Sequence, residues 1–365
     1  MQRGLSTQPI SASREGLRAA FVGLLAATIV VLGIYFGSRR LKDFDTALVP
    51  YAAASVFAAF SFGHRYAVWI RRPPTWRLFR RTLSLLFTPG HLWSRWRMLF
   101  RGTFRSVGTQ AFVFHRSPRR WLAHLCLMWG CLLAFAITFP LSFGWIRFET
   151  ARDSQRVYEA FVFGVRVFRT NLDSPLASLL FNALVVAAAL VIVGVLLALH
   201  RRGRDRGVLA TQDAAVDLLP LILLFSISAT GLLLTISTHF MNGYRYDFLS
   251  QTHAVTVILL LLYAPFGKLF HIVQRPMQLG VHVVREAGAA GEQARCARCD
   301  EPFASVMQVA DLKRIEADLG VRYQLRGGKH YQDVCPACRR KNLALLQDGL
   351  WRAARRGDEN AKEET

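Results

Sequence analysis

The stretch THAVTVILLLLYAPFGKLFHI, residues Thr252–Ile272, decides the fold of this chain, because it is apolar and long enough to cross a bilayer. It holds two histidines eighteen residues apart, His253 and His271. In a continuous helix this spacing is five turns, so both imidazoles are expected on one face, about 27 Å apart. An imidazole within a membrane is costly, which predicts a functional role. Haem ligation is the chemistry that favours neutral imidazoles in a helix bundle, with metal or quinone binding as alternatives.

The composition indicates an integral membrane protein. Hydrophobic residues make up 52% of the 365 residues, and the mean hydropathy is +0.25. We expect an all-α membrane protein, a six-transmembrane helix bundle with a small cytoplasmic zinc-ribbon-like C-terminal domain. The apolar runs long enough to cross are Leu17–Phe36, Ala47–Ile70, Trp121–Phe143, Ser178–Leu199, Leu218–Ile236 and Thr252–Ile272.

The net charge of +22 is spread unevenly over the loops between the spans, and this asymmetry indicates the membrane topology. The segment Arg71–Arg120 holds twelve arginines and no acidic residue, whereas Gly144–Pro175 balances five arginines with four acids. The excess of positive charge on cytoplasmic loops predicts a multi-pass protein of the bacterial inner (cytoplasmic) membrane with both termini cytoplasmic. The short basic loop around Arg39 runs against this orientation. Nucleic acid is not an expected partner.

The chain is predicted to have four consecutive parts. A cytoplasmic N-terminus (1–16) precedes a six-span haem-binding membrane domain (17–284), which includes an interfacial basic segment (71–120). A cytoplasmic metal-binding domain (285–350) and a disordered tail (351–365) follow.

We expect short helices in two of the segments between the spans. In 71–120, arginines alternate with aromatic residues, which predicts one or two interfacial helices broken at Pro89-Gly90. They would either anchor the chain to anionic lipid or dock a cytoplasmic partner subunit. The stretch Ile146–Asp173 contains RVYEAFVFGVRVF, for which we expect a surface-lying helix.

Histidines on different spans can be paired by their expected depth in the membrane. The third span runs outward and begins near His124, and the sixth runs inward and ends near His271, so both are expected at the inner surface. A bis-histidine haem needs such a pair, and Gly130 would leave room for a porphyrin. His64 could be a third inner ligand, a proton or quinone contact, or a polar residue reaching the headgroups. His253 has no clear imidazole partner, so a second haem is unsupported.

Quinone contacts are assigned to polar residues near either surface. A quinone carbonyl needs a hydrogen-bond donor and quinol oxidation needs a proton acceptor, and imidazole can supply both. The outer candidates are His253, His239 and Arg245, and the inner ones are His64 and Arg65.

Two C-x2-C motifs predict a metal site in the C-terminal domain. They are Cys296/Cys299 and Cys335/Cys338, and a pair of such knuckles supplies four thiolates for a tetrahedral ion. A reducing cytoplasm argues against two disulfides. Structural zinc is favoured over iron, because Asp300 follows the first knuckle where small residues usually allow close amide-to-sulfur contacts; iron stays open. The two other cysteines, Cys126 and Cys131, are expected to pack within the third span.

Residues from about Ala47 to Val284 resemble a known family. The motifs GVLLALHRRGRDRG, ATGLLLTISTHFMNG and PFGKLFHI, with the span RRWLAHLCLMWGCLLAFAITFP, are similar to the membrane cytochrome b (gamma) subunit of respiratory nitrate reductases and to the cytochromes of heterodisulfide-reductase-like complexes. The resemblance implies that His124 and His271 hold an inner haem b. The nitrate reductase pattern places a second histidine where this chain has Ala134, which leaves the outer haem in doubt.

The resemblance implies an electron-transfer subunit of a quinone-linked oxidoreductase complex. It would pass electrons between membrane quinone or quinol and a cytoplasmic iron–sulfur redox partner. The chain has no cluster-binding cysteine array and no nucleotide motif, so it is not expected to be a complete enzyme. The alternative is a haem-free transporter or scaffold whose cysteine domain recruits partners, although the repeat symmetry typical of transporters is not evident.

Overall fold

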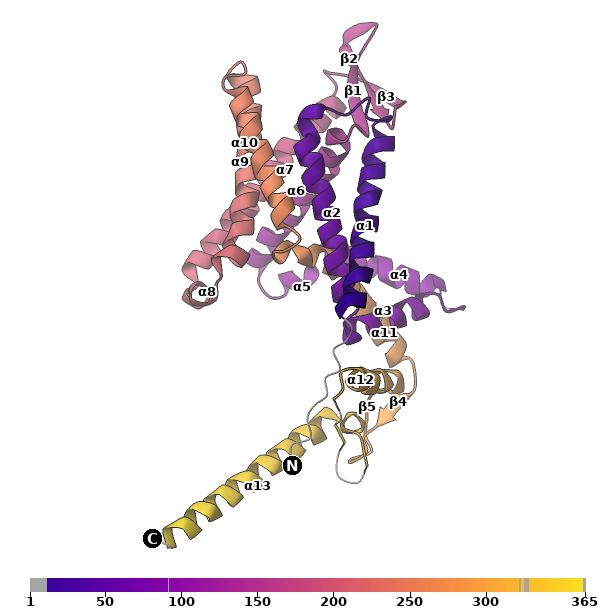
Figure 1. Ribbon diagram of the computed structural model, residues 1–365, viewed down its shortest axis with the longest axis vertical. Coiled ribbons are helices and arrows are strands. Elements are labelled where there is room, and N and C mark those ends of the chain that lie inside the picture. The colour runs from indigo at the N-terminus through magenta and orange to yellow at the C-terminus, as the bar shows by residue number, and fades with distance from the viewer. Residues whose placement is uncertain (1–11, 91, 322, 325–327, 364–365) are drawn as a thin grey trace. The chain divides into compact units, whose positions relative to one another are not determined.

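The computed structural model describes residues 12–90, 92–321, 323–324 and 328–363. Most of the expected N-terminal segment 1–16 therefore lies outside the described residues. The chain divides into two compact units, which are described separately (Figure 1). Unit 1 comprises residues 1–69 and 103–275, and unit 2 comprises 70–102 and 276–365.

Unit 1 is a bundle of apolar helices. Five helices in the described residues are long and apolar enough to cross a membrane, or six if a pair bent by 67° is counted as one span, which fits a multi-pass membrane protein. The long helices are α1 (Ala12–Gly37), α2 (Val49–Ile70), α6 (Pro118–Ser142), α7 (Pro175–Arg204), α9 (Leu219–Phe240) and α10 (Tyr246–Tyr263). The short ones are η1 (Thr46–Leu48), η2 (Phe104–Gly108), α5 (Ala111–Phe114), α8 (Arg206–Thr211), η3 (Ala214–Leu218) and η4 (Lys268–Phe270).

The outward faces of these helices are apolar, as a lipid environment requires. On α1, the side chains of Leu17 and Phe21 are 71% and 67% exposed. In water such a surface would be unfavourable, whereas lipid tails would cover it. Helix α7 begins where Ser174 accepts a hydrogen bond from the Ala177 amide at 3.1 Å, and Pro175 occupies its first turn.

Helices α6 and α7 approach closely through two glycines. A Cβ on Gly130 of α6 would lie 2.7 Å from Val191 Cγ2, and one on Gly194 of α7 would lie 2.7 Å from Leu127 Cγ. The space beside Gly130 is therefore filled by α7, and the expectation that it leaves room for a porphyrin is wrong. Small residues allow membrane helices to pack backbone against backbone, which explains both glycines.

The segment Ile146–Asp173 is a three-stranded antiparallel sheet, so the expected surface helix is wrong and the fold is not purely α (Figure 1). Alternating β-branched and aromatic residues favour strands. Phe163 and Gly164 turn the chain with φ of 50° and 82°, as a two-residue hairpin requires. The strands are β1 (Ile146–Ala151), β2 (Ser154–Val162) and β3 (Val165–Asn171).

The sheet and the residue before it are attached to α1 and to the loop that follows α1. The indole of Trp145 donates to the Gly33 carbonyl at 2.8 Å. Asp43 accepts two hydrogen bonds of 2.6 Å from Arg39 and pairs with Arg147 of β1. The Arg39 hydrogen bonds hold the pKa of the Asp43 carboxyl below its usual value, despite the opposing effect of burial. The loop arginine that ran against the charge rule is thus neutralised by an acid close in sequence.

Unit 2 combines amphipathic helices with the cysteine domain. One or two helices are expected around Pro89-Gly90, and two are present, separated around Gly90 with a φ of 84°. Its elements are α3 (Pro73–Leu86), α4 (Leu92–Thr103), α11 (His271–Ala289, in this unit from Pro276), β4 (Gln293–Arg295), β5 (Pro302–Ser305), α12 (Val306–Asp318), η5 (Tyr331–Asp333) and α13 (Pro336–Glu363).

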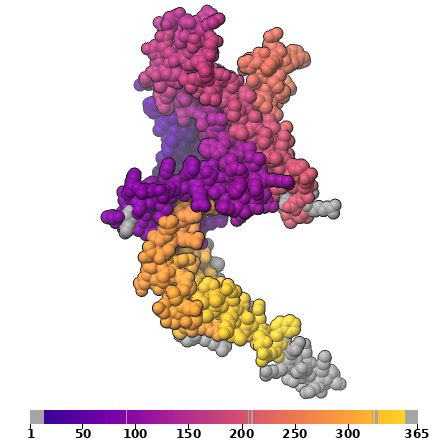
Figure 2. Space-filling model, turned by 180° about the vertical axis from the view of Figure 1, so that it is seen from behind, coloured from indigo at the N-terminus to yellow at the C-terminus, as the bar shows by residue number. Residues whose placement is uncertain are grey.

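Helix α13 extends up to Glu363, through most of the segment 351–365 for which we expect a disordered tail; the last two residues lie outside the described part. Residues with good helix propensity predominate here and no proline interrupts them. Asp348 and Arg352 add an ion pair of 2.9 Å one turn apart. Figure 2 shows the described side chains of α13 projecting from the rest of unit 2.

Candidate functional site

Two histidines from different helices meet in unit 1. His124 lies in the first turns of α6, and His271 is the first residue of α11. Their ring centres are 6.4 Å apart, and the ring planes are inclined by 65°. The structure therefore brings together the two residues that the sequence pairs by depth.

One nitrogen of each ring can be assigned. His271 Nδ1 lies 2.5 Å from the Lys268 carbonyl, which can only accept, so this nitrogen carries the proton and Nε2 has a free lone pair. His124 Nδ1 is buried and has no hydrogen-bond partner among the described residues. A buried polar atom without a hydrogen-bond partner is unusual in a folded protein.

A break in the sixth apolar run positions His271. Helix α10 ends at Tyr263 and α11 begins at His271, with a 67° bend between α10 and the following helical segment. The expectation of one continuous helix with both histidines on one face is therefore wrong. Pro265 has no amide hydrogen to continue the helix. Arg65 of α2 donates to the free Pro265 carbonyl, and its guanidinium lies 4.4 Å above the Phe270 ring.

His253 of α10 is held by a hydroxyl group. Its Nδ1 lies 2.9 Å from Thr230 Oγ1 of α9. The Thr230 hydroxyl donates to the Ser226 carbonyl at 2.7 Å, so it accepts from His253. Gly231 makes room, since a Cβ there would lie 3.4 Å from the imidazole. Thr230 was missed by the sequence reasoning; the only signal was its place beside a glycine in an apolar span.

The other candidate residues are separate from the His124–His271 pair. The His64 ring stacks on Phe60 of the same helix, with centres 6.0 Å apart. His239 is exposed at the end of α9. Arg245 immediately precedes α10 in a left-handed conformation, with φ of 57°, and its guanidinium carbon lies 5.5 Å from the Tyr244 ring centre. Quinone binding by His64, Arg65, His253, His239 or Arg245 stays a prediction.

The four C-terminal cysteines form a cluster that can hold a metal ion. The sulfur atoms of Cys296, Cys299, Cys335 and Cys338 all lie within 4.8 Å of one another. Cys299 and Cys335 Sγ are 3.8 Å apart. Four ligands with metal–sulfur bonds of about 2.3 Å around one tetrahedral ion have edges of about 3.8 Å. The cluster therefore has the dimensions of a tetrahedral thiolate site such as that of zinc.

Local structure presents the two knuckles from different elements. The first lies in the turn between β4 and β5, where Asp300 adopts a left-handed conformation with φ of 58°. The second opens α13, with Pro336 at the start of the helix. The Cys335 amide donates to Cys296 Sγ at 3.2 Å, which links the knuckles directly.

The thiols differ in acidity. Burial opposes ionisation of Cys296, but the backbone amides of Cys335, Cys299 and Arg298 outweigh it and lower the pKa of Cys296 to about 6. The neighbouring Cys335 sulfur raises the pKa of Cys338 to about 12. One thiolate forms readily, and several at once need a cation to offset their repulsion.

Comparison of the chain with models of known families, with curated proteins and with solved structures gave no significant match.

Proposed function

We propose that the chain is a b-type cytochrome subunit that transfers electrons between membrane quinone or quinol and a cytoplasmic iron–sulfur partner. The observation that supports this best is the His124–His271 pair. Two imidazoles that share one metal ion have ring centres roughly 6 Å apart, since each metal–nitrogen bond is about 2 Å and each ring centre lies roughly 1 Å beyond its nitrogen. The observed 6.4 Å agrees with this spacing. The resemblance of the motifs around these residues to nitrate reductase gamma subunits supports the same assignment.

The residues present fit a haem b between α6 and the start of α11. When bound, haem supplies reversible one-electron chemistry. The chain's own contribution is orientation: the Lys268 carbonyl fixes the His271 tautomer and leaves Nε2 for the metal. Arg65 holds the break before His271 by donating to Pro265. A second haem at His253 is not proposed, because this chain has Ala134 where the resembled pattern has the partner histidine.

The remaining parts of the proposal concern quinone, partner and membrane. Imidazole can donate to a quinone carbonyl or accept a proton from quinol, and His253 is the candidate we favour because only one of its nitrogens is engaged. The arginine-rich 71–120 segment favours a cytoplasmic location for both termini in a bacterial inner membrane. For the cysteine cluster we propose a zinc-ribbon-like structural zinc site, with the exposed Arg340 and Lys341 after the second knuckle available for docking the redox partner. Arg339 is engaged with Val334 and Gln332.

A reduced-minus-oxidised absorption spectrum of the purified chain tests the proposal. We expect sharp haem b bands, which are lost in His124→Ala and His271→Ala. His200→Ala, an exposed histidine near the end of α7, is the matched control and should leave the bands unchanged. Absence of haem from well-folded wild-type protein expressed with sufficient haem would reject the cytochrome and favour the transporter or scaffold.

A further inference from the structure

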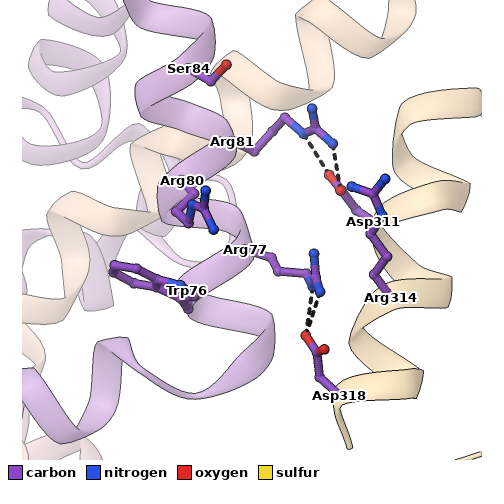
Figure 3. A pocket seen from close by; sticks show the side chains of 8 residues that line it. All are labelled: Trp76, Arg77, Arg80, Arg81, Ser84, Asp311, Arg314 and Asp318. Atoms are coloured by element: carbon purple, nitrogen blue, oxygen red, sulfur yellow. Dashed lines mark hydrogen bonds and ion pairs between the residues drawn. The ribbon is translucent and has the colours of Figure 1, made fainter.

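Helices α3 and α12 of unit 2 are joined by two ion pairs that form the walls of a groove (Figure 3). Arg81 binds Asp311 through two bonds of 2.8 and 2.7 Å. One helical turn away, Arg77 contacts Asp318 at 2.9 and 2.7 Å. Arg77 precedes Arg81 in the sequence, whereas its partner Asp318 follows Asp311, so the two helices run antiparallel. These two ion pairs hold the walls of the groove together and leave its other arginine side chains out of the pairing.

The groove has more positive charge than its acids neutralise. Its lining contains four arginines and two aspartates. Arg80 and Arg314 are exposed, and neither forms an ion pair with a carboxylate in the described part of the chain. Two cations are thus available to a ligand, while the two that pair with Asp311 and Asp318 maintain the walls. Such an arrangement favours an anion over a neutral or cationic ligand.

Other lining residues indicate the kind of anion. Trp76, Arg80 and Ser84 are spaced four residues apart, so they form one stripe along α3. This stripe combines an aromatic ring, a guanidinium and a hydroxyl. A phosphodiester accepts hydrogen bonds from guanidinium and hydroxyl groups, and tryptophan is typical of the membrane interface.

We propose that this groove binds the phosphate headgroup of an anionic membrane lipid. Helix α3 begins at Pro73, only three residues after the candidate span of α2 ends at Ile70, so the chain itself keeps α3 at the membrane end of that span. Exposed apolar side chains on the same helical segment, Leu83 and Phe87, suit contact with acyl chains. A soluble phosphate ester would share the charge chemistry but would not need these apolar residues.

Native mass spectrometry of the full-length protein, released from nanodiscs, tests the proposal. We compare retention of cardiolipin and phosphatidylglycerol with that of phosphatidylcholine. Wild type should retain anionic lipid, and Arg80→Gln with Arg314→Gln should weaken retention roughly tenfold. Arg101→Gln on α4, an exposed arginine of the same unit outside the groove, is the matched control.

Two results would overturn the proposal. One is equal anionic-lipid retention by the groove variant and the Arg101 variant. The other is binding of inorganic pyrophosphate in the groove with no preference for anionic over zwitterionic lipid, which would assign a soluble ligand. An unchanged melting temperature and metal content of the groove variant verify folding. The groove residues belong to unit 2, whereas His124 and His271 belong to unit 1. The groove variants should therefore leave the haem spectrum unchanged, whether or not the groove binds lipid.

Discussion

Lys268 and Asp217 form an ion pair, although 51 residues separate them in sequence. Asp217 lies in η3 before α9, and Lys268 opens the short turn η4 before α11. The same Lys268 supplies the carbonyl that accepts from His271 Nδ1. The ion pair therefore stabilises the turn that orients the proposed haem ligand.

Replacing Asp217 by Asn should weaken haem retention about tenfold, the order expected when a residue that orients a ligand is lost. The measurement is haem content after dilution, together with the reduction potential of the remaining haem. Asp217→Glu should restore most of the retention. Asp247→Asn, in the first turn of α10, serves as the control. Wild-type retention and potential in folded Asp217→Asn protein would contradict the positioning role.

The Asp43–Arg39 contact should make the folding stability depend on pH in the acidic range. The pKa of Asp43 is lowered in the folded chain, so its contribution is present above the ordinary aspartate pKa and is lost as the pH falls through the lower folded value. Asp43→Asn should cost about 1–2 kcal/mol at neutral pH, and progressively less as the pH falls below the ordinary aspartate pKa of about 3.9. Thermal unfolding in detergent across this range checks it.

Asp153 offers a matched comparison for Asp43. Its pKa is also lowered by an arginine, Arg169, but both groups are exposed to solvent. Asp153→Asn should therefore change the melting temperature far less at every pH. Equal effects of the Asp43 and Asp153 variants would show that the loop contact adds no more than a surface pair.

The glycines between α6 and α7 should be intolerant of even one methyl group. Gly194→Ala would place Cβ 2.9 Å from the Ala123 carbonyl oxygen as well as against Leu127, and we expect about 1–3 kcal/mol of destabilisation. Gly203→Ala on the same helix has open space at Cβ and should be neutral or slightly stabilising. Comparable melting temperatures of the two variants would exclude tight packing at Gly194.

The cysteine cluster should bind one metal ion per chain through all four thiols. Cys335→Ser should abolish stoichiometric metal and expose unit 2 to protease, because Cys335 and Cys296 also form its buried cluster with Val334. Cys126→Ser, in α6 and outside the cluster, should retain the metal. Elemental analysis of the full-length protein distinguishes zinc from iron. Full metal content in Cys335→Ser would refute four-thiol ligation.

Composition and spacing were enough to predict the first five apolar spans, the break at Pro89-Gly90 and the four-cysteine cluster. These features depend on residues close in sequence: an apolar run needs lipid whatever its neighbours are, and a C-x2-C turn brings its own two sulfurs together. The pairing of His124 with His271 was also predictable, because the direction of each span sets the depth of its residues.

Only the tertiary structure decided how these parts meet. The break at Pro265 depends on Arg65 of another helix, the partner of His253 is a threonine on α9, and the space beside Gly130 is taken by α7. Each of these features depends on which group, distant in sequence, forms a hydrogen bond with a backbone carbonyl or an imidazole nitrogen, or fills a gap between helices. A buried polar group or cavity must be satisfied by whatever the fold places beside it, and local sequence does not specify that neighbour.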